Sequence, residues 1–333
     1  MMNKHQEKEG VPAMTLYEYD RSLGIEGILC GVDEAGRGPL AGDVYAAAVI
    51  LDPNNPIDGL NDSKKLTEKK REALYPVILE KAAAWSVGVA TVEEIETYNI
   101  LQATFLAMRR AVAGLSIQPN LVLVDGNRNP GLELPTRLLV KGDGTSASVA
   151  AASIVAKVAR DHYMAEVAQA YPQYQFLRHK GYGTKLHYEM LDLYGESPVH
   201  RHSFLKSYYR KKGEAIPTTG TRGEQLAAGY LTGQGCEIFE RNWHAACGEL
   251  DLIVRQGEIL AFVEVKTRGP GMIATPAEAV TAAKRQKLVA TAESYLMENP
   301  LPLQPRFDIL EIYLDGDGGF LRADWLQNAF DAV

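Results

Sequence analysis

Short apolar runs alternate with amphipathic stretches along the first 210 residues of the chain. Runs of strand length occupy residues 27–32, 43–51, 85–92, 120–127 and 136–144. Apolar positions recur at helical spacing over residues 67–84, 92–115 and 145–171, and the middle stretch predicts one continuous helix. Residues 1–24 have no such pattern and predict a loose lead-in. Strands that alternate with helices predict an α/β domain built on a layered sheet.

The pattern breaks near residue 215. Residues 209–220 combine charges with Pro, Thr and Gly, which is typical of a linker. A new helix follows, and residues 248–268 predict two strands joined by a turn at Gln256-Gly257. We therefore predict a first domain over residues 25–212, a linker over 213–220 and a second domain over 221–333.

Composition narrows the class of protein. The chain has 333 residues, of which 46% are hydrophobic and 23% charged, as in ordinary globular proteins. Its three cysteines are scattered, which argues against a disulfide framework and for a reducing compartment. Neither a signal peptide nor an apolar span of membrane length is present, so we expect a cytoplasmic protein without membrane contact.

The net charge of −7 argues mildly against a nucleic-acid partner when it is taken alone. The local distribution points the other way. Between residues 178 and 212, Lys, Arg and His outnumber the acids and aromatic residues are interleaved with them. That pattern is typical of a surface that follows a nucleic-acid backbone.

Four acidic residues stand at the ends of predicted strands in the first domain: Asp33, Glu34, Asp125 and Asp143. Functional groups gather at the carboxyl ends of strands in open α/β sheets, so we expect these acids to meet. Oxygen ligands favour Mg²⁺ or Mn²⁺. The alternative is that the acids serve solvated turns, and spacing alone leaves both interpretations open.

Asp33 and Glu34 pose a separate difficulty because neighbouring residues of a strand point to opposite faces. The two acids share a site only if the chain leaves strand geometry there. Gly36 and Gly38, on either side of Arg37, permit such a departure.

Six blocks of the first domain resemble bacterial ribonuclease HII and occur in the order found in that family. They are GVDEAGRGPLAG, LNDSKKLTEKKRE, LVDGN, VKGDGTSASVAAASIVAKVARD, HKGYGT and HRHSF. The resemblance implies a ribonuclease H-like mixed sheet with flanking helices. It also implies hydrolysis of the RNA strand of RNA–DNA hybrids, including single ribonucleotides in duplex DNA. Two Mg²⁺ or Mn²⁺ ions would assist, leaving 5′-phosphate and 3′-hydroxyl ends.

The resemblance also implies roles for individual residues. Asp33, Glu34, Asp125 and Asp143 would be the catalytic, metal-binding acids, although Asp161 is an alternative fourth acid that a surface ion pair with Lys157 explains equally well. Gly36, Arg37 and Gly38 would read the ribose 2′-hydroxyl, Tyr182 would stack on the sugar at the RNA–DNA junction, and Lys64 and Lys65 would contact phosphates. Two alternatives for the whole chain are a catalytically inactive hybrid-binding protein and another ribonuclease H-like nuclease.

In the second domain, a two-residue turn at Gln256-Gly257 would place Asp251 opposite Phe262, one diagonal step from Glu264. Glu249, Asp251, Glu264 and Lys266 would then line one side of the hairpin. Asp followed by Glu-x-Lys resembles the core of restriction-endonuclease-like nucleases. The blocks TRGEQLAAGYL, FERNW and AVTAAKRQKLVATAESYL resemble the YraN-like family, which implies a C-terminal α/β restriction-endonuclease-like domain.

Several roles in this domain stay open. Glu224 matches an acid that related nucleases add from their first helix, but Thr221 and Glu224 also fit a helix capping box. Lys284, Arg285 and Lys287 are expected to face DNA. The domain is either a metal-dependent DNA nuclease or a module that only tethers the enzyme to DNA, and nothing in the sequence indicates an oligomeric state.

Overall fold

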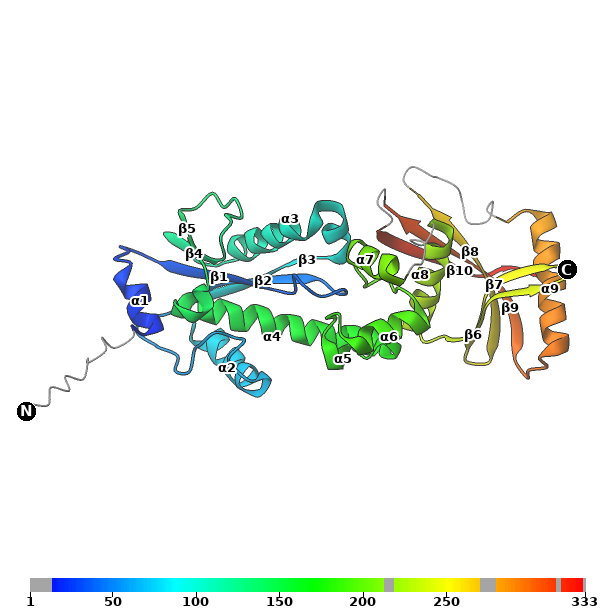
Figure 1. Cartoon of the computed structure of the whole chain (residues 1–333), viewed down its shortest axis with the longest axis horizontal. Coiled ribbons are helices and arrows are strands. Elements are labelled where there is room, and N and C mark those ends of the chain that lie inside the picture. The colour runs from blue at the N-terminus through cyan, green and yellow to red at the C-terminus, as the bar shows by residue number, and fades with distance from the viewer. Residues whose placement is uncertain (1–13, 213–218, 270–279, 316–318, 332–333) are drawn as a thin grey trace, which may run out of the picture. The chain divides into compact units, whose positions relative to one another are not determined.

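The computed structural model describes residues 14–212, 219–269, 280–315 and 319–331 (Figure 1). The chain divides into two compact units. One contains the described residues up to 35 together with 45–89 and 104–159, and the other contains 36–44, 90–103 and the described residues from 160 onward. Two five-stranded sheets are formed, one by the first five strands and one by the last five.

The first sheet has the strand order β3-β2-β1-β4-β5. Its strands are β1 (Leu29–Ala35), β2 (Val44–Ile50), β3 (Ala84–Ala90), β4 (Leu121–Asp125) and β5 (Thr136–Leu139). β1 runs antiparallel to β2 and parallel to β4, and β4 runs parallel to β5, so the sheet is mixed. The predicted mixed α/β architecture is confirmed.

Helices cover this sheet on both sides. α2 (Glu68–Lys81) and α4 (Ala147–Ala170) pack against β1 and β2 through a core of small and branched apolar side chains. Figure 1 shows α3 (Val92–Ala113) across the sheet from α4. Half of the α4 residues in this core are alanines: Ala151, Ala152 and Ala156.

Three local predictions were wrong. α3 is two helices joined at Asn99, whose φ of 67° breaks the helix and whose Oδ1 accepts hydrogen bonds from the N–H groups of Leu101 and Gln102. The predicted strand 136–144 ends at Leu139. The lead-in contains a helix, α1 (Leu16–Ser22), whose first turn is closed by a capping box of Thr15 and Glu18.

The second sheet has the order β10-β9-β8-β7-β6, with only β8 and β9 parallel. Its strands are β6 (Glu237–Ala245), β7 (Gly248–Gln256), β8 (Ile259–Arg268), β9 (Gln304–Leu314) and β10 (Phe320–Phe330). α8 (Thr219–Gly233) packs on one face and α9 (Ala282–Glu298) on the other, each over its own apolar core.

Three short helices lie between α4 and α8: α5 (Phe176–His179), α6 (Lys185–Tyr194) and α7 (His202–Lys212). The first residues of the stretch read as a linker, 209–212, are therefore helical. Residues 213–218 lie outside the described part of the chain, so the domain boundaries stay a prediction. No helix in the described ranges is long and apolar enough to cross a membrane.

Candidate functional sites

Asp33 and Asp125 lie level with one another on neighbouring parallel strands. Val32 pairs with Val124, and the next residue of each strand is an aspartate. Side chains at equivalent positions of adjacent strands leave the same face of a sheet. Gly31 shares that face with Asp33, and a Cβ on Gly31 would lie 2.1 Å from the backbone of Ser148. The missing side chain lets α4 approach, which leaves Asp33 only 5% exposed.

Both carboxyl groups are electrostatically strained. Burial, and then the charges of Glu34 and Asp125, raise the pKa of Asp33 well above its usual range, while its Oδ1 accepts a hydrogen bond of 2.7 Å from the Glu34 N–H. Burial also raises the pKa of Asp125, whose Oδ1 accepts a 2.6 Å hydrogen bond from the Gly142 N–H. The ionised forms of this pair call for a nearby positive charge.

Asp143 brings a third carboxyl group to this place. It lies in a 3₁₀ turn, Gly142–Gly144, beyond the end of β5 and is 3% exposed. Its charge raises the pKa of Asp125 further. The prediction that Asp143 ends a strand was wrong, because β5 ends at Leu139 and Asp143 lies in the turn that follows. The turn nevertheless brings the Asp143 side chain close to Asp125.

Lys64 is the cation of this acidic cluster. Its Nζ lies 3.5 Å from Asp143 Oδ2, a buried oxygen that has no hydrogen-bond partner. Partial burial works to lower the pKa of Lys64, but the charges of Asp143, Asp33 and Asp62 outweigh it and raise that pKa. Lys65 turns instead toward Asp62, 4.0 Å away. The two lysines, expected to act alike, have different neighbours.

Glu34 and Asp161 depart from expectation. β1 stays a strand through Ala35, so the predicted break in strand geometry between Asp33 and Glu34 is absent, and the chain turns only at Gly36, with φ of +99°. Glu34 nevertheless belongs to the site electrostatically, since its charge raises the pKa of Asp33. Asp161 is 5% exposed, so a surface ion pair does not describe it.

The chemistry of these acids suits a divalent cation, although their side chains are not arranged as a complete set of metal ligands. Within the described ranges, no three His, Cys, Asp or Glu side chains lie in the geometry of a metal site. Yet Asp143 Oδ2 is buried without a hydrogen-bond partner, and Asp33 and Asp125 have raised pKa values. Oxygen ligands of this kind suit Mg²⁺ or Mn²⁺.

The loop after β1 is held from inside by two buried arginines that the sequence analysis did not single out. Arg160, in α4, donates hydrogen bonds to the carbonyls of Ala41, Asp43 and Lys180. A Cβ on Gly36 would lie 2.1 Å from Arg160 Nε, so this position excludes any side chain. The glycine is required by packing as well as by its positive φ.

Arg201, which is fully buried, is the second arginine. It donates to the carbonyl oxygens of Gly36 (2.6 Å), Arg37 (3.1 Å), Pro39 (2.9 Å) and Gly42 (2.8 Å). Burial, and then Arg160, lower the pKa of Arg201 to about 9, so the guanidinium is still charged at neutral pH. Because the C=O and N–H of a trans peptide point in opposite directions, the N–H groups of Arg37 and Gly38 face away from Arg201.

Tyr182 lies beside this loop. The Leu40 N–H donates to Gly181 O at 2.8 Å, which joins the loop to the turn that carries Tyr182. The Tyr182 ring is 3.8 Å from the place where a Cβ on Gly38 would lie, and the residue is 43% exposed. The structure therefore brings Tyr182 and Gly38 together, with the ring open to solvent.

In the second domain the predicted strand register was wrong, because the turn lies one residue later than predicted. The turn is Gly257-Glu258, and Gly257 takes its first place with φ of +60°, as a type II′ turn requires. Ile253 therefore pairs with Phe262 and Leu252 with Val263, and this register, continued by one residue, puts Asp251 opposite Glu264 rather than opposite Phe262. The corrected register places the two acids closer than predicted.

Two lysines neutralise this pair of acids. Glu264, 3% exposed, receives Lys266 Nζ at 2.6 Å and Lys284 Nζ at 3.2 Å, both on Oε1, while its buried Oε2 has no hydrogen-bond partner. Burial, and then Glu264, raise the pKa of Asp251 to about 6, and its Oδ2 accepts a 2.7 Å hydrogen bond from the Val265 N–H. The orphaned Oε2 fits a cation here too.

Of the other residues predicted for this domain, some lie near the acids and some do not. Glu224 joins it, since its charge also raises the pKa of Asp251. The capping-box alternative was wrong because α8 begins at Thr219, two residues before Thr221. Lys284 points at Glu264, whereas the Arg285 guanidinium lies over the Phe330 ring, so these two do not form one basic face. Lys287 lines a cleft of about 430 Å³ together with Glu249 and Lys284.

Comparisons with known proteins match both parts of the chain. Residues 30–207 match the profile of the family described as Ribonuclease HII, and residues 223–312 match Uncharacterised protein family UPF0102. The chain is 61% identical over 178 residues to a ribonuclease HII of Dechloromonas aromatica, covering 54% of this chain and 91% of that protein. Identity to the Vibrio campbellii ribonuclease HII is 59% over 177 residues, covering 53% and 84%.

A solved structure, the ribonuclease H2 of Pyrococcus horikoshii, aligns with a TM-score of 0.42 and 25% identity over 62% of this chain and 99% of that one. The sequence relatives carry more weight, because each is covered almost whole by the part of the chain that contains the acidic cluster and the glycine loop. On that coverage and identity, the chain belongs to the ribonuclease HII family.

Proposed function

We propose that residues 25–212 form an endoribonuclease that hydrolyses the RNA strand of RNA–DNA hybrids and cuts at single ribonucleotides embedded in duplex DNA. One observation carries the proposal: Asp33 and Asp125 stand level on adjacent parallel strands with raised pKa values, and Asp143 reaches them from a turn. The buried acids Asp33 and Asp143 and the half-buried Asp125, next to one lysine, form a site for cations and phosphates. They do not form a fold-stabilising network.

Asp33, Glu34, Asp125 and Asp143 are the residues that would hold Mg²⁺ or Mn²⁺. Such ions supply charge neutralisation at the scissile phosphate and an activated water when they are bound. The chain itself contributes position. The Gly142 N–H fixes one oxygen of Asp125, and the Glu34 N–H fixes one oxygen of Asp33. Lys64 and Lys65 offer ammonium groups to neighbouring phosphates of the substrate.

Selection of RNA would come from the loop that begins at Gly36. Arg201 draws the loop carbonyls inward, and the N–H groups of Arg37 and Gly38 face the other way. Hydrogen bonds from these groups suit a ribose 2′-hydroxyl and its phosphate, and the 2′-hydroxyl is the group that distinguishes RNA from DNA. The exposed Tyr182 ring beside Gly38 suits stacking on the adjoining sugar.

The first test is cleavage of a labelled DNA duplex that contains one ribonucleotide, with Mg²⁺ or Mn²⁺, beside the Asp125→Asn variant. We expect cleavage at the ribonucleotide by the native chain alone. Binding of hybrid without cleavage under either metal would favour the alternative of an inactive hybrid-binding protein. A fully deoxyribonucleotide duplex is the substrate control.

For residues 221–333 we propose a metal-dependent phosphodiesterase site made of Glu224, Asp251, Glu264 and Lys266. The buried Oε2 of Glu264, which has no hydrogen-bond partner although Oε1 receives two lysines, supports it, since a domain that only tethered DNA would have no use for such an oxygen. A supercoiled plasmid with Mn²⁺, tested against Glu264→Gln, separates the two hypotheses: nicking that the variant loses supports the nuclease, and DNA binding without nicking supports the tether.

The domain limits 25–212 and 221–333 and a cytoplasmic address belong to the same proposal. All three cysteines are free thiols, which suits a reducing compartment.

A further inference from the structure

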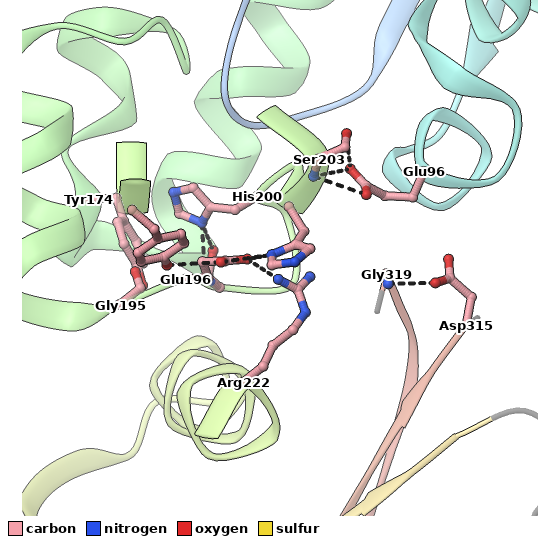
Figure 2. Close-up of polar contacts among 12 residues, drawn as sticks. Glu96, Tyr174, Gly195, Glu196, His200, Ser203, Arg222, Asp315 and Gly319 are labelled. Carbon is pink, nitrogen blue, oxygen red and sulfur yellow. Dashed lines mark hydrogen bonds and ion pairs between the residues drawn. The ribbon is translucent and has the colours of Figure 1, made fainter. Parts of the chain in front are cut away.

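A buried carboxylate connects the ribonuclease part of the chain to α8. Glu196, between α6 and α7, is fully buried and accepts hydrogen bonds from His202 Nδ1 at 3.1 Å and Tyr209 Oη at 2.9 Å. It also accepts one from an Arg222 guanidinium nitrogen at 2.5 Å, as Figure 2 shows. Arg222 itself is 2% exposed. Loss of one member of such a buried pair leaves the other charge unpaired and is strongly destabilising.

α8 presents a second face to the same region. Arg222, Gln225, Gly229 and Gly233 recur at intervals of three and four residues and so lie along one side of the helix. A Cβ on Gly229 would lie 2.9 Å from Ser197 Cα, and one on Gly233 would lie 3.0 Å from the Tyr171 ring. The other side of α8 is in the apolar core of the second sheet. The helix is therefore shaped to pack on both sides.

The ion pair is one residue away from the arginine that holds the glycine loop. Arg201, bound to the loop carbonyls, is followed by His202, bound to Glu196. Next comes Ser203, whose N–H and hydroxyl both donate to Glu96, as Figure 2 shows. Three successive residues are thus anchored by three different partners. Displacement of His202 would move Arg201, and with it the carbonyls of the loop.

We propose that Arg222 is a positioning residue for the ribonuclease reaction, acting through Glu196 and His202 on Arg201 and the loop of residues 36–42. This inference rests on the proposed ribonuclease function. Arg222 lies outside the stretch that matches ribonuclease HII, so the second domain would serve the first reaction structurally, whatever its own chemistry. The expected consequence is weaker binding of the ribose, with the chemical step unchanged.

The test compares Arg222→Met with Arg222→Lys and with Arg255→Met in the full chain. Arg255 is a matched control because it pairs with Glu237 on the exposed surface of the second sheet. We expect Arg222→Met to raise KM for the single-ribonucleotide duplex about tenfold with kcat within about twofold of the native value. Arg222→Lys should recover part of the loss, and Arg255→Met should behave as the native chain does.

Amide hydrogen exchange without substrate separates this inference from the proposed activity. Faster exchange confined to residues 36–42 and 196–203 in Arg222→Met supports it even if no substrate is cleaved. Unchanged exchange at residues 36–42 with a native KM would overturn it, as would faster exchange throughout the chain. If Arg222→Met does not fold, Tyr209→Phe removes one hydrogen bond from Glu196 without leaving a buried charge and should produce the same pattern more weakly.

Discussion

The two acidic sites of this chain neutralise their charges in different ways. At the first, Asp33, Asp125 and Asp143 are served by one lysine, Lys64, whose side chain is 82% exposed. At the second, Glu264 alone is paired with two lysines, Lys266 and Lys284, whose side chains are 29% and 32% exposed. An exposed ammonium is screened by water and stabilises a buried carboxylate weakly.

Under the proposed function, the difference separates two kinds of metal-dependent site. The first leaves most of its negative charge for cations from solution to neutralise, so its empty state is destabilised. The second carries its own cations, so a metal ion has to compete with lysines that are already in place. The following predictions test that distinction, beginning with the largest expected effect.

Asp33→Asn should abolish cleavage and stabilise the fold. We expect the ribonuclease rate to fall by about 10³-fold or more, because a ligand that anchors the cations is lost. The amide oxygen of Asn still accepts the Glu34 N–H, and the variant removes a buried negative charge. The melting temperature in EDTA at pH 7 should therefore rise, and a lower one would show that Asp33 already has a compensating cation.

Asp251 should make the metal-free protein less stable as the pH rises. Its pKa is about 6 in the folded state, above the ordinary value of 3.8, so the folded state binds more protons than the unfolded state between these values. The free energy of unfolding should fall by up to about 3 kcal/mol across that window from this group alone. Denaturant titrations in EDTA at pH 4 to 7 measure the change.

Asp251→Asn is the matched control for this pH dependence. The variant cannot titrate at residue 251, so its stability should decline less between pH 4 and 7 than that of the native chain. If the free energies of unfolding of the two proteins change in parallel with pH, ionisation of Asp251 does not destabilise the folded state. The second site would then resemble a fully neutralised ion-pair network.

Lys284→Met should strengthen cation binding at the second site. Lys284 and Lys266 share one oxygen of Glu264, so removal of either leaves that carboxylate more open to a divalent ion. We expect the Kd for Mn²⁺ to fall about tenfold by calorimetry, in line with one partly buried charge. Lys287→Met, one turn of α9 away, should change it little. Weaker binding in Lys284→Met would show that the lysine helps to assemble the site.

The sequence predicted the fold class, and its candidate acids lie close enough to shift one another's pKa, but it did not predict how the side chains are held. Apolar alternation and six ordered blocks locate Asp33, Asp125 and Asp143 without reference to distance. The turn of the second hairpin was predicted one residue too early, which shifted the pairing by two residues, since choosing between Gln256-Gly257 and Gly257-Glu258 depends on which residue takes positive φ. A polar Asn that interrupts α3 was hidden within a continuous helical pattern.

Arg201 and Arg160 were missed for a different reason. Both are charged and lie in polar or mixed stretches, where exposure is the ordinary expectation. Arg160 donates to the carbonyls of Ala41 and Asp43, and Arg201 to that of Gly36, all more than 100 positions away in the chain, and local pattern carries no information about such partners. The one available signal was the glycine-rich loop itself, whose inward carbonyls need a donor.

Lys64→Met gives the smallest of the expected effects. It tests whether the exposed ammonium of Lys64 neutralises the first site only weakly. Lys64 and Lys65 are adjacent, but only Lys64 lies within 3.5 Å of Asp143, so Lys65→Met is the matched control. We expect the Mn²⁺ affinity of the first site to rise by roughly threefold in Lys64→Met and to stay unchanged in Lys65→Met, measured without nucleic acid. A gain as large as that of Lys284→Met would mean that exposure does not set the strength of these ammonium groups. The two sites would then differ only in the number of their lysines.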